Sequence, residues 1–141
     1  MPFTVPDKLP IGWYLKEADS LITQYVNASF ESFGINRFHW QLIKNISLHG
    51  KICQSLYYHQ VSRFMTEAEL AEIFASLVER HWIAQDGDMY SFTEAGKTAF
   101  ALIEEKQLEN RKHMMEGTTQ EEYDITISFL ERVIRNMGGK I

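Results

Sequence analysis

Residues 66–97 carry the pattern that most narrows the folds open to this chain: a helix, a tight hairpin and the start of another helix. Thr66 suits a helix N-cap, and Glu69 stands three residues later, where a capping box needs it. The apolar positions that follow have the spacing of one helix face: Leu70, Ile73, Phe74, Leu77 and Val78. An Asp-Gly-Asp turn at 86–88 then separates two short extended segments, and Thr93 can cap the next helix. This order of elements indicates a winged helix-turn-helix.

More helices are predicted ahead of this stretch. Pro10 suits a first helical turn, apolar residues repeat after it at helical spacing, and Gly34 is placed to end this long helix. Asn36 can cap a second helix that runs to about residue 46, and residues 51–58 are expected to form a third. The predicted fold is therefore mainly α.

The chain after Thr93 is predicted to be helical to about residue 116 and again from a second capping box at Thr119 and Glu122. The last helix carries a seam with steps of four and three residues: Tyr123, Ile127, Leu130, Ile134 and Met137. Such a seam needs burial, and two-fold self-association is the commonest way to obtain it. The alternative is that both terminal helices pack on the core of their own chain.

Length and charge restrict the class of protein. A chain of 141 residues is expected to form a single domain, and its formal net charge of −5 gives no overall sign of a nucleic-acid partner. Cys53 is the only cysteine, which excludes an internal disulfide and is typical of a reducing cytoplasm. The sequence has no apolar run of the roughly 20 residues that a membrane span needs, and its first residues do not resemble a signal peptide.

Two segments resemble signatures of the MarR family of bacterial transcriptional regulators. LVERHWI followed by SFTEAGK is similar to the family's L-x-x-x-G-hydrophobic and L-T-x-A-G-(K/R) pattern, and FGINRFHWQLIKNI is similar to the opening of its second helix. The resemblance implies a winged helix-turn-helix at 36–97 with a two- or three-stranded β-wing, flanked by dimerisation helices at 10–34 and 98–139. It also implies a homodimer that binds a palindromic operator in double-stranded DNA and responds to a small aromatic or apolar effector.

The resemblance also indicates which residues meet each ligand. The candidates for DNA contact lie in the third helix, the following turn and the Thr66 helix: Lys51, Gln54, Ser55, Arg63, Thr66, Glu67, Glu69 and Arg80. The candidates for effector binding are rich in aromatic groups: Trp13, Tyr14, Arg37, His39 and Trp40. Each aromatic residue taken singly can instead be part of the core.

The sequence departs from a typical DNA-binding protein in its charge. The segment 66–83 holds four glutamates and one arginine, and the hairpin adds Asp86 and Asp88 but no cation. In contrast, residues 37–63 contain no Asp or Glu and four cations, which can form a positive patch. Two hypotheses remain: a working DNA-binding regulator, or a MarR-like scaffold that has lost operator binding and acts as a ligand- or protein-binding module.

Other chemistry finds little support. His49, Cys53 and His59 have a spacing that matches no standard zinc site. No nucleophile-base arrangement or phosphate-binding glycine loop is recognisable. The sequence therefore predicts no catalytic residue, no metal site and no cofactor, and the chain is not expected to be an enzyme.

Overall fold

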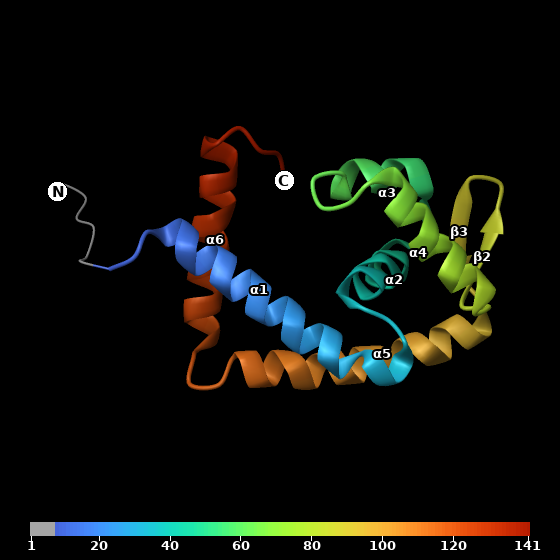
Figure 1. Ribbon diagram of the computed structural model, residues 1–141, viewed down its shortest axis with the longest axis horizontal. Helices are drawn as coiled ribbons and strands as arrows, with labels where there is room; N and C mark the ends of the chain where they lie inside the picture. Colours follow the sequence, from blue (N-terminus) through green and yellow to red (C-terminus); the bar gives the residue numbers. More distant parts are fainter. Residues whose placement is uncertain (1–7) are drawn as a thin grey trace. The chain divides into compact units, whose positions relative to one another are not determined.

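The structure is a computed structural model that describes residues 8–141 (Figure 1). Its elements follow the order α1 (Ile11–Ser29), a 3₁₀ turn (Glu31–Phe33), α2 (Arg37–His49), β1 (Lys51–Cys53), α3 (Gln54–Val61), α4 (Glu67–Glu79), β2 (Ile83–Asp86), β3 (Met89–Phe92), α5 (Glu94–Met114) and α6 (Gln120–Asn136). The three strands form one antiparallel sheet in the order β1-β3-β2. The predicted fold class, mainly α with a small β-wing, is confirmed.

The described chain divides into two compact units. The first ends at Asn110 and holds α1 to α4, the sheet and most of α5; the second, from Arg111 to Ile141, holds α6. Within the first unit, α2 contacts α1, α4, β1 and β3, so it forms the centre of the core. The expectation that all 141 residues form a single domain remains a prediction.

The core of the first unit joins the helix-turn-helix to the sheet. Its largest fully buried side chains are Phe30, Leu42, Ile43, Ile46, Leu70, Phe74, Leu77, Ile83 and Ile103. The Phe74 ring lies 4.6 Å from the Tyr90 ring and 6.4 Å from the Tyr57 ring, between centroids. Burial of one such side chain contributes about 1.5–3 kcal/mol, so the apolar face predicted for α4 fixes this helix against the wing.

Two predicted boundaries are wrong. Helix α1 ends at Ser29 rather than near Gly34, because Phe30 is fully buried and the chain turns through 31–33 before Gly34 closes the turn at φ 69°. Lys51–Cys53 is a strand rather than the start of the third helix. Ile52 is buried opposite Tyr90 in the β1–β3 ladder, and this pairing over a long sequence separation overrides the local helical pattern.

His81 is the only described residue other than glycine with a positive φ, at 61°. It follows α4, and the L-x-x-x-G signature has glycine at this position. A left-handed conformation costs a residue with a side chain about 1 kcal/mol more than glycine. We therefore expect His81→Gly to raise the free energy of unfolding by about 1 kcal/mol in urea denaturation. Glu79→Gly, inside α4, should lower the free energy of unfolding by a similar amount. If both variants had a lower free energy of unfolding than the wild type, the backbone at His81 would not be strained.

Candidate nucleic-acid interface

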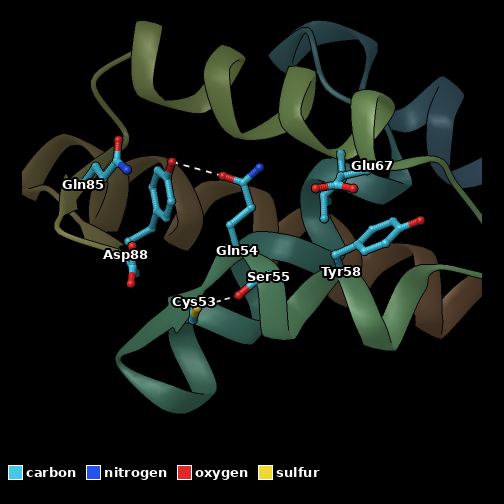
Figure 2. A pocket seen from close by; sticks show the side chains of 9 residues that line it. Cys53, Gln54, Ser55, Tyr58, Glu67, Gln85 and Asp88 are labelled. Atoms are coloured by element: carbon cyan, nitrogen blue, oxygen red, sulfur yellow. Dashed lines mark hydrogen bonds between the residues drawn. The ribbon is translucent and has the colours of Figure 1, made fainter.

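Helices α3 and α4 form the helix-turn-helix, and the first turn of each lies beside the wing. The N-terminus of α4 is fixed by the predicted capping box: the Thr66 hydroxyl accepts from the Glu69 N–H at 3.1 Å, and the Glu69 carboxylate accepts from the Thr66 N–H at 2.9 Å. Figure 2 shows the concave surface between the two helices and the hairpin, about 260 Å³ in volume. It is lined by Cys53, Gln54, Ser55, Tyr58, Glu67, Leu70, Gln85, Asp88 and Tyr90.

The polar groups of this cavity are held by short local contacts. The Tyr90 hydroxyl donates to the Gln54 side-chain oxygen at 3.2 Å, which orients the Gln54 amide beside α4 (Figure 2). Ser55 Oγ lies 3.2 Å from Cys53 Sγ, and this hydrogen bond lowers the pKa of the Cys53 thiol. Gln54, Ser55 and Glu67, three of the residues predicted to contact DNA, line this cavity together, and their contact with DNA stays a prediction.

The outward face of α4 carries small side chains that the sequence analysis did not single out. Ala68, Ala71 and Ala75 are all exposed, and Glu72 and Glu79 are exposed among them. The signal was present in the sequence, since three alanines recur at steps of three and four outside the apolar face. A helix with methyl groups on its exposed side can approach another surface closely.

Half of the predicted positive patch is neutralised inside the chain. Arg37 forms an ion pair with Asp19 at 2.9 Å, and Lys44 forms one with Glu104 of α5. Lys51 and Arg63 are exposed and form no ion pair with residues 8–141. The cations free to meet phosphate around the helix-turn-helix are therefore Lys51 in β1 and Arg63 in the turn before α4.

The Arg80 side chain makes several contacts within the chain. Its guanidinium donates to the carbonyl oxygens of Phe33, at 2.7 Å, and Gly34, and it lies over the Trp82 ring at 5.0 Å from the centroid. These contacts connect the end of α4 to the turn after α1. Arg80 thus has fewer donors left for DNA than the sequence prediction assumed, and Thr66 and Glu69 are likewise engaged in their capping box.

The five predicted effector residues lie in different surroundings. Trp13 and Tyr14 are exposed on α1 with their rings 5.1 Å apart, whereas the Trp40 indole donates to Glu104 at 3.2 Å. Arg37 donates to Thr23 as well as to Asp19. Among these residues, His39 lines a groove between α2 and α4 that the other four do not line.

The surroundings of His39 favour its neutral form. Burial lowers the pKa of His39 below its ordinary value of 6.5, and the nearby charge of Arg80 lowers it further. Its Nδ1 accepts from the Asn36 N–H at 3.1 Å, within the capping box of α2, and only an unprotonated Nδ1 can accept. The neutral ring thus supports the start of α2.

This arrangement predicts a loss of stability in acid. Because the pKa of His39 is lower in the folded chain, the unfolded chain binds a proton at His39 first as the pH falls. The contribution of His39 to stability is therefore present above its ordinary pKa of 6.5 and is lost as the pH falls toward the pKa of the folded chain. The urea midpoint should fall between about pH 7.5 and pH 5.5. His39→Gln, whose amide oxygen can still accept the capping bond, should show a smaller fall. An equal fall in both proteins would exclude His39 as the cause.

Other kinds of site find no support in the part of the chain that the structure describes. No cluster of three or more His, Cys, Asp or Glu side chains within residues 8–141 is placed to hold a metal ion. No described helix is both long and apolar enough to span a membrane.

Comparison with known proteins identifies the fold. The chain is similar to ligand-free NadR, with a TM-score of 0.78 and 15% identity over 92% of this chain and 96% of that chain. It is also similar to a cysteine variant of Escherichia coli MarR in complex with operator DNA, with a TM-score of 0.75 and 13% identity over 89% and 94% of the two chains. A Mycobacterium tuberculosis MarR family protein in complex with DNA gives a TM-score of 0.75 and 13% identity over 89% and 98%.

No protein-family model and no curated protein matches the sequence. The likeness is therefore carried by the structure, and it confirms the MarR-type fold that the signatures of the sequence predicted.

Proposed function

We propose that this chain is a DNA-binding transcriptional regulator that works as a homodimer on a palindromic operator and is modulated by a small molecule. The observation that carries the proposal is the helix-turn-helix α3–α4, with an exposed small-residue face on α4, in a fold shared with two proteins solved in complex with DNA. No catalytic step is part of the proposal, and the protein would act in the bacterial cytoplasm.

In the proposed complex α4 enters the major groove. The methyl groups of Ala68, Ala71 and Ala75 would contact thymine methyl groups, and Gln54 would donate to a base edge beside them. Lys51 and Arg63 would contact phosphates on either side of α4. The carboxylates of α4 would restrict the site, because a carboxylate accepts from cytosine N4 but repels phosphate.

Dimerisation is proposed from the apolar surface that the terminal helices leave exposed. No residue of α6 is buried in the described chain, and Ile127 and Phe129 are 40% and 46% exposed. The first half of α1 is exposed throughout and includes Trp13, Tyr14 and Leu15. A second copy would cover these faces, and two-fold symmetry would place two α4 helices about one DNA turn apart.

The dimer is tested by sedimentation or light scattering. The purified chain should have about twice its monomer mass of 16.5 kDa. Ile127→Asp should shift it toward the monomer, because a charge on the apolar face opposes burial. Ser128→Asp puts the same charge one residue away, on a polar position, and should leave the dimer intact. A monomeric wild type would overturn the dimer.

The effector is proposed to act by changing the spacing of the two winged helix-turn-helix domains. Trp13, Tyr14, Arg37, His39 and Trp40 remain the candidates for its site in the dimer, with a small aromatic or apolar ligand as the partner. Some conformations of the dimer would space the two domains so that they cannot both contact DNA. A ligand that binds these conformations more tightly would release the operator by a population shift.

Operator binding is tested on the DNA upstream of the protein's own gene, with random DNA of equal length as the competitor. Tight binding that weakens steeply as salt rises would support the proposal, since each phosphate contact releases counterions. A folded dimer that prefers no fragment of its genome over random DNA, even at low salt, would overturn it in favour of a scaffold that binds a ligand or protein.

A further inference from the structure

A second concave surface lies on the flank of α4 that faces α2. It has a volume of about 450 Å³, which falls in the range of small-molecule sites. Three segments form it: the first turn of α2, the turn between α3 and α4, and one side of α4. This surface, here called the α2–α4 groove, is lined by Asn36, Phe38, His39, Phe64, Met65, Glu69, Glu72, Ile73 and Ser76.

Four of the nine residues that line the groove are apolar, and one of these four is an exposed aromatic side chain. Phe38, Met65 and Ile73 pack toward the core and present part of their surface to the groove. Phe64 stands in the turn before α4 with 69% of its surface exposed. A concave surface that combines apolar and aromatic side chains with a few polar groups is a common feature of small-molecule sites.

The two charged side chains that line the groove are both carboxylates. Glu69 and Glu72 lie one turn apart on α4, and the groove is lined by no Lys or Arg. Glu69 uses one carboxylate oxygen for the Thr66 N–H, whereas Glu72 is exposed and forms no hydrogen bond or ion pair within residues 8–141. Burial lowers the pKa of His39 and so disfavours a positive charge on its ring.

We infer that the α2–α4 groove binds a small organic cation with an apolar or aromatic body. The apolar lining would hold the body of the ligand, the Phe64 ring would face its cationic group, and Glu72 would supply the opposite charge. The same carboxylates disfavour an organic anion of equal size. The inference does not depend on DNA binding, because the groove and its charges belong to a single copy of the chain.

Calorimetric titration with two matched probes tests the inference. One probe is a phenylpropyl-trimethylammonium cation, and the other is the phenylbutyrate anion, which has a similar body and the opposite charge. The cation should bind and the anion should not, and added salt should lower the affinity for the cation. Equal binding of both probes, or of neither, would overturn the inference.

Three variants locate the site. Glu72→Gln removes one carboxylate from an exposed position and should lower the affinity for the cation by about two- to fivefold. Phe64→Ala should weaken it by a similar factor, and thermal unfolding would verify that this variant is folded. Glu79→Gln removes the same charge from α4 outside the groove and should leave the affinity unchanged. An equal loss in the Glu72 and Glu79 variants would show general charge attraction and overturn the site.

Discussion

Replacement of Gly96 by alanine should lower the free energy of unfolding of this protein by about 3 kcal/mol or more. That is a large part of the whole free energy of unfolding of a domain of this size. A Cβ at position 96 would lie 1.8 Å from the carbonyl oxygen of Trp82 and 2.7 Å from its carbonyl carbon. Both atoms are backbone, so a change of rotamer cannot relieve the clash. The first turn of α5 would have to move away from the chain that leads into the wing.

The surroundings of Gly96 oppose such a movement. The Trp82 carbonyl accepts from the Thr93 N–H at 3.0 Å, and the Thr93 hydroxyl accepts from the Gly96 N–H at 3.0 Å while donating to the His81 carbonyl. A shift of α5 would break these bonds together. Because Thr93 joins α5 to the end of α4, the loss would extend into the helix-turn-helix and reduce any function that depends on it.

Urea denaturation measures this effect, with Gly12→Ala as the matched control. Gly12 lies in the first turn of α1, and within this chain an added Cβ there would meet no atom within 4 Å, so the same substitution should stabilise the fold by at most about 0.5 kcal/mol. Opposite signs at the two glycines would identify the clash with Trp82 as the cause. A Gly96 variant that unfolds at the wild-type midpoint would show that α5 can separate from Trp82 without cost.

The features that sequence predicted well are those set by neighbours in the chain. The capping boxes at Thr66 and Thr119 were read from a threonine and a glutamate three residues apart, and both are present in the structure. The hairpin followed from the Asp-Gly-Asp turn, and Gly87 does adopt a positive φ of 61°. Such patterns are local, so a single sequence contains what is needed to recognise them.

The features that sequence missed depend on contacts between distant residues. Lys44 counted toward a positive patch because no acid lies near it in the chain, yet Glu104, sixty residues later, is its partner. Arg80 was taken as a DNA contact, but it donates to carbonyl groups more than forty residues earlier. The sequence shows how many cations a segment contains. It does not show which of them form ion pairs or hydrogen bonds inside the folded chain.

Gly96 and His81 show the same distinction within one signature. The T-x-A-G pattern marked Gly96, but only the structure supplies the reason, which is the approach of the Trp82 carbonyl. His81 stands where the signature has glycine, and its φ of 61° is a conformation that glycine adopts readily. A motif therefore predicts a backbone conformation more reliably than it explains each side chain.

The double variant Lys51→Ala/Arg63→Ala should nearly abolish the proposed operator binding at physiological salt. These are the two exposed cations around the helix-turn-helix that form no ion pair with residues 8–141. Near an acidic α4 they would provide most of the local attraction for phosphate. Loss of both should weaken binding at least about tenfold at low salt, on operator and random DNA alike, since phosphate contacts carry no sequence information.

The slope of affinity against salt separates this effect from misfolding. Each lost phosphate contact should make the logarithmic slope shallower by about 0.9. The control is Lys106→Ala/Lys112→Ala, which removes the same charge from α5, outside the helix-turn-helix, and should keep both slope and affinity. An equal loss in both double variants would mean that net charge alone attracts DNA. If neither variant changed binding, the phosphates would have to be held by other residues, and the proposed orientation of α4 would be wrong.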